Sequence, residues 1–267
     1  MSKARPAAGV AGGALGGLYP SPSHGSPSSS GYRLTDDFLR PPEGTLYGDM
    51  RWEAITMGSA PVVTQITPST ALEVGIARVA TNASPSADEG GLLGWPVAGG
   101  RQWHTTPQVG VHYTAKLSIK NDTYVRAFSG LIQNQAPWWT GTNDCIGFRA
   151  SAGAAAANWF GVVRVGGSEN TVDLGVEANS TYRVMRWARV IDEDGNDGIQ
   201  FYLGTQPTQA HNHCYPVLWT AVGSIVTTMP TANALTICPA AVATQNTSQR
   251  SVDIDYLDLG GPARRVA

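Results

Sequence analysis

The segment VGVHYTAKLSIK, residues 109–120, alternates between apolar or small side chains and polar ones. A period of two is typical of a β-strand, in which successive side chains point to opposite faces. We therefore expect one face against a core and the other toward solvent. The predicted core face contains Val109, Val111, Tyr113, Ala115, Leu117 and Ile119. The predicted solvated face contains Gly110, His112, Thr114, Lys116, Ser118 and Lys120.

The chain from residue 32 onward continues this β character. Asn121-Asp122 predicts a tight hairpin that joins the first strand to a second one at 123–132. Further strands are predicted at 71–80, 145–150, 158–165, 181–191, 198–204, 234–243 and 251–259. Many strands separated by short turn-rich pieces, with no amphipathic helix between them, predict an all-β sandwich or barrel.

The first 31 residues, MSKARPAAGVAGGALGGLYPSPSHGSPSSSG, differ in composition from the rest. Gly, Ala, Ser and Pro dominate, so this segment has little to bury and is expected to be an extended arm that a partner protein orders. Glycine interrupts its apolar stretch, which argues against a secretory signal. The predicted organisation is an arm at 1–31 and a β-sandwich domain at 32–267.

Charge and cysteine content limit the function classes. Only 14% of the 267 residues are charged and the formal net charge is −2, so we expect no nucleic-acid binding. No apolar run is long enough to predict a membrane span. Cys145, Cys214 and Cys238 are odd in number and far apart, which predicts buried free thiols made in a reducing compartment.

Residues 158–206, NWFGVVRVGGSENTVDLGVEANSTYRVMRWARVIDEDGNDGIQFYLGTQ, have a recognisable order. An aromatic strand and a polar hairpin precede a strand introduced by a polar turn and Tyr182, and an acidic glycine turn then leads to FYLG. The pattern resembles the concanavalin-A-like, laminin-G-like jelly roll that recurs in bacteriophage virion proteins. It departs from that pattern at Gly204-Thr205, where a turn carboxylate is usual.

The resemblance implies a concanavalin-like jelly-roll β-sandwich preceded by the extended N-terminal arm. It also implies a structural protein of the virion, made in the host cytoplasm, that decorates the capsid or forms a head fibre. The arm would anchor it to other virion proteins, and the sandwich would face outward. A homo-oligomer, taken to be a trimer, is expected. On this interpretation the chain is not an enzyme and needs no cofactor.

The segment SVDIDYLDL, residues 251–259, keeps catalysis open as an alternative. Retaining glycosidases of this fold use a Glu-x-Asp-x-x-Glu strand, and Asp253 and Asp255 would share one face at a spacing that suits such a pair. Asp258 falls on the opposite face unless a β-bulge intervenes. The alternative that we favour has Val252, Ile254 and Tyr256 in the core. The acids would then face solvent or a neighbouring arginine.

Two short clusters are candidate metal sites. Asp192, Asp194 and Asn196 lie in an oxygen-rich turn that could hold Ca²⁺, although a solvated hairpin tip explains it better. His211 and His213, beside Cys214, could ligate zinc, but no further ligand pair accompanies them.

Four tryptophans lie in Gly/Pro-rich surroundings and are candidate contacts to a glycan or a protein interface: Trp95, Trp103, Trp138 and Trp139. Exposed aromatic rings can stack on sugars or anchor an interface, and they can equally fill the ends of a sandwich. These rings support a second hypothesis, in which the protein is a carbohydrate-binding adhesin or a tail receptor-binding protein that recognises surface glycans.

Overall fold

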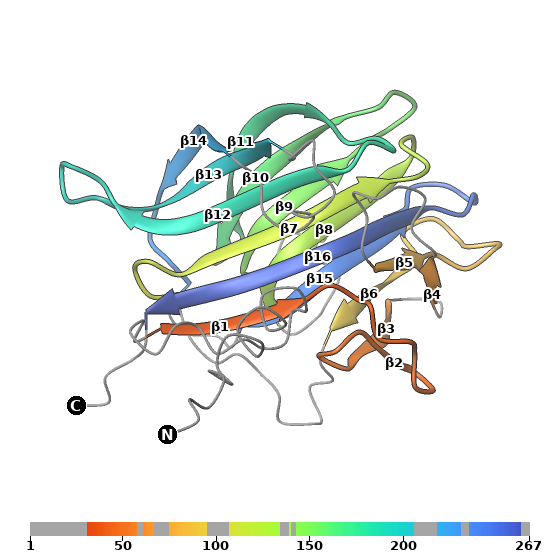
Figure 1. The fold of residues 1–267 in the computed structure, drawn as a ribbon. Coiled ribbons are helices and arrows are strands. Elements are labelled where there is room, and N and C mark those ends of the chain that lie inside the picture. The colour runs from red at the N-terminus through yellow and green to blue at the C-terminus, as the bar shows by residue number, and fades with distance from the viewer. Residues whose placement is uncertain are drawn as a thin grey trace, which may run out of the picture.

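Two antiparallel sheets pack face to face in the computed structural model of this chain, which describes residues 31–57, 61–66, 75–94, 107–133, 139, 143–205, 218–230 and 235–262 (Figure 1). Sheet A has the spatial order β14 (Leu218–Val226), β13 (Asp197–Thr205), β12 (Arg183–Ile191), β7 (His112–Ile119), β16 (Ser251–Pro262), β5 (Ile76–Ala80) and β4 (Val62–Ile66), and β1 (Gly31–Asp36) also pairs with β16. Sheet B has the order β11 (Ser168–Glu177), β10 (Asn158–Val165), β9 (Cys145–Ser151), β8 (Val125–Gln133), β15 (Leu235–Thr244), β6 (Gly90–Gly94), β3 (Trp52–Met57) and β2 (Leu46–Tyr47).

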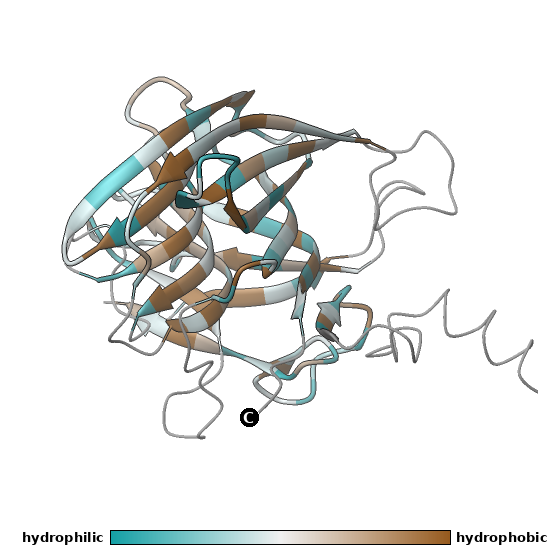
Figure 2. Ribbon diagram, turned by 90° about the vertical axis from the view of Figure 1, so that its left-hand side faces the viewer, coloured by the Kyte–Doolittle hydropathy of each residue, from teal (hydrophilic) through white to brown (hydrophobic). Residues whose placement is uncertain are grey.

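The core lies between the sheets and is built from the alternating strands. Figure 2 shows hydrophobic and hydrophilic bands that alternate along the ribbons. The predicted inward face of residues 109–120 is confirmed from Val111 to Ile119, which are buried, whereas Val109 is exposed. Tyr113 stacks on Trp187 with ring centres 5.9 Å apart, and its hydroxyl lies 2.7 Å from Ser129 Oγ. Large aromatic rings of this kind carry much of the burial that stabilises a sandwich.

The predicted hairpin at Asn121-Asp122 is wrong. β7 pairs with β12 and β16 in sheet A, whereas β8 pairs with β9 and β15 in sheet B. Backbone hydrogen bonds hold the two ends of the connection to different layers, since Lys120 N donates to Ser251 O and Tyr124 N donates to Gly153 O. Residues 121–124 are therefore a crossover between layers, because each of the two strands contributes an apolar face to the same core.

Several strands carry no clear signal in the sequence. β6 reads GGLLG and β11 reads SENTVDLGVE, so glycine and polar residues hide them, yet sheet pairing holds both. β1, β2, β3, β4 and β14 were also not predicted. Tertiary pairing can override the local preference of a strand, which is why composition misses these elements. Residues 1–30 of the predicted arm lie outside the described residues, and Gly31, its last residue, begins β1.

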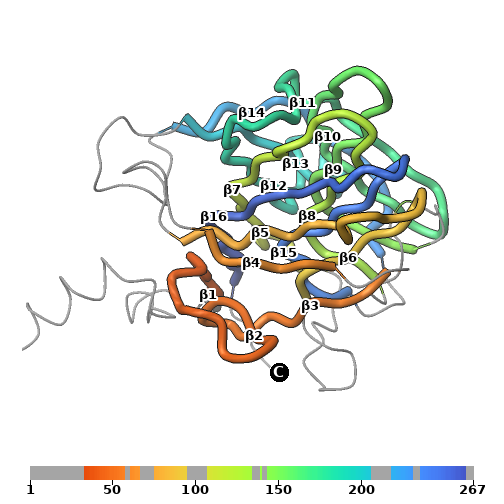
Figure 3. Tube along the Cα trace, turned by 90° about the vertical axis from the view of Figure 1, so that its right-hand side faces the viewer, coloured from red at the N-terminus to blue at the C-terminus, as the bar shows by residue number. Residues whose placement is uncertain are grey.

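The last strand of the chain lies in the interior of sheet A. β16 runs between β7 and β5, and β1 pairs with its C-terminal half (Figure 3). The acidic segment 251–259 is therefore surrounded by neighbouring strands. Among the described residues, no helix is long and apolar enough to span a membrane.

Two of the three cysteines are buried free thiols, as predicted. Cys145 and Cys238 are each almost fully buried and form no disulfide. Burial raises the pKa of the Cys145 thiol to about 12, so it stays protonated and packs as a small apolar side chain. Cys214 lies outside the described residues.

Candidate functional site

A β-bulge in β16 brings three aspartates to the outer face of sheet A. Ile254 pairs with Leu117 and the next pair is Tyr256 with Lys116, so Asp255 is the extra residue. The bulge reverses the alternation after Ile254. Buried core positions are therefore Val252, Ile254, Leu257 and Leu259. The expected inward position of Tyr256 is wrong, because after the bulge Leu257 and Leu259 take the core positions.

Cations neutralise the carboxylates in the middle of this face. Asp255 forms an ion pair with Lys116, and both side chains are at least 98% buried. Arg78 donates to both oxygens of Asp253 at 2.7 and 2.9 Å, and Lys120 Nζ lies 3.5 Å from the same carboxylate. The Tyr182 ring lies against both lysines, with Nζ-to-centroid distances of 5.3 and 5.1 Å.

The paired network closes the outer face that the sequence predicted to be solvated. Thr114, Lys116 and Ser118 are 0–1% exposed. A lysine is fully buried almost exclusively when it is paired. Asp253 thus faces a neighbouring arginine, as the favoured alternative allows, and Asp255 faces a lysine.

Asp258 completes the acidic row at the other end of β16. Arg33 Nε donates to it at 2.8 Å, and His112 Nε2 lies 3.5 Å from its second oxygen. Burial opposes ionisation, but the hydrogen bonds and the charges of His112 and Arg33 together outweigh it and hold the pKa of Asp258 below its usual value. A glycosidase acid needs a raised pKa, so Asp258 does not fit that role.

A hollow of about 290 Å³ lies beside Asp258 on the same outer face. It is lined by Gly110, His112, Arg186, Ala188, Tyr202 and Trp219. Strand register brings these residues together, because Arg186 pairs with both Thr114 and Tyr202, and Trp219 pairs with the nearby Gly204. The site therefore draws on β7, β12, β13 and β14.

Arg186 is held firmly in this hollow. Its guanidinium carbon lies 4.2 Å from the centre of the Trp219 ring, which is a close cation–π contact. Its Nε donates to Thr114 Oγ1 at 3.0 Å. Burial lowers the pKa of Arg186, while Asp258 and Tyr256 act in the opposite direction. Among the described residues, no carboxylate lies within ion-pair distance of Arg186.

Trp139, the candidate tryptophan that the structure describes, does not line this hollow. Trp139 is half-buried, packs against an apolar cluster that includes Phe128 and Ile132, and lies 6.0 Å from the Arg126 guanidinium. The other three candidates, Trp95, Trp103 and Trp138, lie outside the described residues. No motif in the sequence indicated Arg186, Tyr202 or Trp219. The first two occupy polar-face positions of predicted strands, so alternation in 181–191 and 198–204 could have indicated them.

The candidate calcium turn is a hairpin tip between β12 and β13. Asp192 accepts hydrogen bonds from the backbone of Asp194 and Asn196, at 3.0 and 2.7 Å, and from the Asn196 side chain at 3.0 Å. These bonds, led by that of the Asn196 side chain, lower the pKa of Asp192. The hairpin interpretation is confirmed, and the turn's own donors occupy the carboxylate. His211 and His213 lie outside the described residues.

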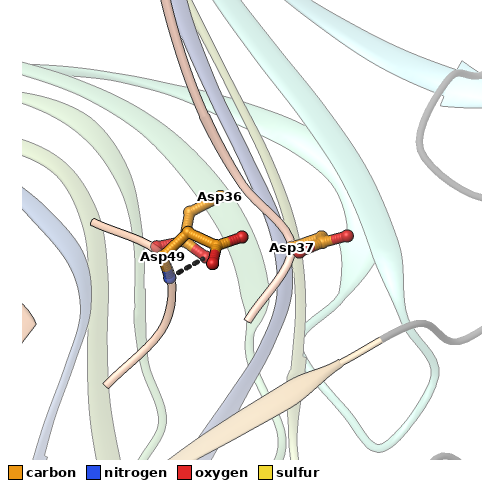
Figure 4. A group of neighbouring side chains, drawn as sticks. All are labelled: Asp36, Asp37 and Asp49. Atoms are coloured by element: carbon orange, nitrogen blue, oxygen red, sulfur yellow. Dashed lines mark hydrogen bonds between the residues drawn. The ribbon is translucent and has the colours of Figure 1, made fainter. Parts of the chain in front are cut away.

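A different acidic group forms where β1 ends. Asp36, Asp37 and Asp49 each place a carboxylate oxygen within 4.8 Å of the others (Figure 4). Asp36 accepts from the Phe38 and Met50 backbone at 2.7 and 2.9 Å and from the Trp52 indole at 2.8 Å. Because its oxygens are occupied in this way, Asp36 acts as an internal tie between β1 and β3.

Burial sets the titration of this acidic group. It raises the pKa of Asp36 to about 6, although four hydrogen bonds act in the opposite direction. It raises the pKa of Asp37 to about 7, and the charges of Asp36 and Asp49 add to the effect. Among the described residues, no cation lies within ion-pair distance of Asp36 or Asp37, in contrast to the acids of β16.

Solved structures share this fold. A protein of unknown function from Shewanella oneidensis MR-1 has a TM-score of 0.59 at 13% identity, over 100% of both chains. An endo-β-1,4-glucuronan lyase from the fungus Trichoderma reesei has a TM-score of 0.51 at 7% identity, over 85% of this chain and 94% of the lyase chain. A Bacillus licheniformis β-glucanase has a TM-score of 0.49 at 11% identity, over 85% of this chain and 97% of that one. No family model and no curated protein matches the sequence.

The predicted fold class is confirmed as a concanavalin-like jelly-roll β-sandwich. The expectation that the chain is not an enzyme is corrected, because this fold includes the glucuronan lyase, and a sandwich of this kind gives no ground for excluding catalysis. The proteins named in these comparisons do not connect the chain to bacteriophage virions.

Proposed function

We propose that this protein binds a polysaccharide on the outer face of sheet A, with the Arg186–Trp219 hollow as the central contact. The observation that carries the proposal is the convergence of Arg186, Tyr202 and Trp219 in one hollow on a polar sheet face. Aromatic rings offer flat apolar surfaces to sugar rings, while guanidinium, phenol and imidazole groups bond to hydroxyls. Its volume is near the lower end of small-ligand sites, about 300 Å³, which suits one unit of a longer glycan.

A glycan array followed by calorimetry tests this proposal. Trp219→Ala should lower the affinity for the best array ligand by about 10-fold or more, since such aromatic anchors contribute about 2 kcal/mol. Trp139→Ala is the matched control, because that ring is half-buried and does not line the hollow. If no glycan binds, or if both variants weaken binding equally, the site is wrongly assigned.

Cleavage of the bound glycan is a second candidate function. It is favoured by His112, which lines the hollow and is oriented by the buried carboxylate of Asp258. A histidine positioned by a carboxylate can act as a general acid or base. His112→Asn should abolish product formation while lowering glycan affinity less than Trp219→Ala does. Size-exclusion analysis of digested polysaccharides measures the products, and unchanged product yield in the variant would exclude this role for His112.

Attachment to a virion remains a separate prediction, based on the sequence resemblance. A glycan site on an outward-facing sandwich is compatible with a particle-surface protein whose arm, residues 1–31, binds other virion proteins. Light scattering combined with limited proteolysis of the arm tests this prediction. A monomer whose arm is cut rapidly indicates an arm that orders on a larger assembly. A trimer with a protected arm indicates that the arm joins the subunits.

A further inference from the structure

We infer that the hollow recognises a sugar carboxylate, so that the ligand is a uronic-acid-containing glycan bound through Arg186. This inference rests on the proposed glycan-binding function and names its substrate class. It depends on a difference between arginines of the same sheet face. Arg33 and Arg78 each bond a buried carboxylate, at 2.8 and 2.7 Å, whereas Arg186 has none within reach among the described residues.

The unpaired state of Arg186 is unusual for its surroundings. Its side chain is half-buried, and burial lowers its pKa. Removing a charge from water is unfavourable unless a partner compensates it. Asp258, the nearest acid of β16, is already bonded by Arg33 and His112. A bound anion would therefore supply the counter-charge that the described part of the chain does not supply.

The orientation of the guanidinium favours a planar anion. Nε donates to Thr114 and the guanidinium carbon lies over the Trp219 ring, so only the two terminal nitrogens remain without a hydrogen-bond partner among the described residues. Paired terminal nitrogens match the two oxygens of a carboxylate in bidentate geometry. Tyr202 lines the same hollow and is placed to contact the sugar that carries the carboxylate.

Calorimetry with defined oligosaccharides tests the inference on the full chain. Oligoglucuronate and oligogalacturonate should bind at least 10-fold more tightly than neutral oligosaccharides of the same length and linkage. Arg186→Gln should weaken the acidic ligands by about 10- to 100-fold, as expected for a charge-assisted hydrogen-bond pair, and should weaken the neutral ligands, which lose only bonds to hydroxyls, by less than it weakens the acidic ones. Arg186→Lys should recover part of the affinity, because it restores the charge without the planar fork.

Arg183→Gln is the matched control. Arg183 lies on the same strand and has no ion pair with a described residue, but it lines a separate hollow with Tyr182 and Leu203. It should change affinity for acidic glycans by less than twofold. A thermal melt of each variant separates loss of binding from loss of folding, and if Arg186→Gln unfolds, Arg186→Lys carries the test.

The possible outcomes separate the two proposals. If neutral and acidic oligosaccharides bind equally and Arg186→Gln affects them alike, the carboxylate inference is overturned and the glycan-binding proposal stands. If sulfated oligosaccharides bind more tightly than uronates, the hollow recognises a different anionic group and the inference is again overturned. If no oligosaccharide binds, the proposed function fails as well.

Discussion

The outer face of sheet A has two halves that treat charge in opposite ways. On the side of β16 and β5, the carboxylates of Asp253 and Asp255 are each neutralised by a buried or half-buried cation. On the side of β12 to β14, Arg186 lies in a hollow and no described carboxylate neutralises it. Carboxylates that all have a cation partner stabilise the folded chain. A guanidinium that lies beside an aromatic ring and has no described carboxylate partner is available to a ligand. Changes in the first half should therefore alter stability, and changes in the second should alter binding.

The largest effect is expected where the pairing is most buried. Lys116→Met leaves the carboxylate of Asp255 without its cation at a position that is 0% exposed. We expect unfolding free energy to fall by about 3–5 kcal/mol, measured by denaturant titration. The double variant Lys116→Met with Asp255→Leu should recover most of this loss, because an apolar pair can replace a buried ion pair. A loss below about 1 kcal/mol in the single variant would contradict the comparison.

A smaller loss is expected at the rim of the same network. Arg78→Met removes the main partner of Asp253, but Lys120 and the Tyr182 hydroxyl remain at 3.5 and 3.4 Å. The Arg78 side chain is 31% exposed, so water also screens its contribution. We expect a loss of about 2 kcal/mol by the same titration, and Lys120→Met added to it should increase the loss. A stability loss as large as that of Lys116→Met would show that solvent exposure does not determine how much each ion pair of this network contributes to stability.

Asp37 supplies the converse case, a buried carboxylate without a described cation. Its pKa is raised from 3.8 to about 7, so the folded state binds a proton more readily than the unfolded state. Its contribution to stability is therefore present below about pH 4 and is lost as pH rises through 7. Asp37→Asn should be more stable than the parent at pH 8 by on the order of 2 kcal/mol and nearly equal to it at pH 4.

Denaturant titrations at several pH values measure this difference. The control is Asp49→Asn, which changes the exposed member of the same group. Because the charge of Asp49 is only a minor cause of the raised Asp37 pKa, Asp49→Asn should reduce only slightly the increase in unfolding free energy between pH 8 and pH 4. If the unfolding free energy of Asp37→Asn depends on pH as that of the parent does, the buried Asp37 carboxylate is not the cause of this pH dependence.

The smallest effect on stability is expected in the hollow. Arg186→Ala removes one hydrogen bond to Thr114 and one cation–π contact with Trp219. Because no ion pair with a described residue is broken, the unfolding free energy should fall by only about 1 kcal/mol. Thermal melts beside the binding data provide the check. A loss of unfolding free energy comparable to that of Lys116→Met would mean that Arg186 stabilises the fold and is not reserved for binding a ligand.

Local pattern predicted much of the sandwich and little of the site. The strands at 109–120, 158–165 and 181–191 were found because alternation reveals which face is buried. The hollow could not be found in the same way. Its members come from four strands, and their meeting depends on the pairing of β12 with β7 and of β13 with β14.

The acidic segment of β16 shows the limit most clearly. Alternation alone placed Asp258 on the face opposite to Asp253 unless a bulge intervened, and it assigned Tyr256 to the core. The structure places the bulge at Asp255, whose carboxylate forms an ion pair with Lys116. The bulge directs all three acids outward. Cations from β1, β5 and β7 then decide that these carboxylates are structural.

By itself, strand alternation determined that this chain forms an all-β sandwich or barrel, because a strand's period of two depends on neighbouring residues. The sequence also determined which positions carry charge, aromatic rings and free thiols. Only the tertiary structure decided which sheet each strand joins, where the alternation shifts, and which charges meet. Those choices depend on contacts between residues far apart in the chain, such as Arg78 with Asp253 and Arg186 with Trp219. Their free energy arises only when the two layers are assembled.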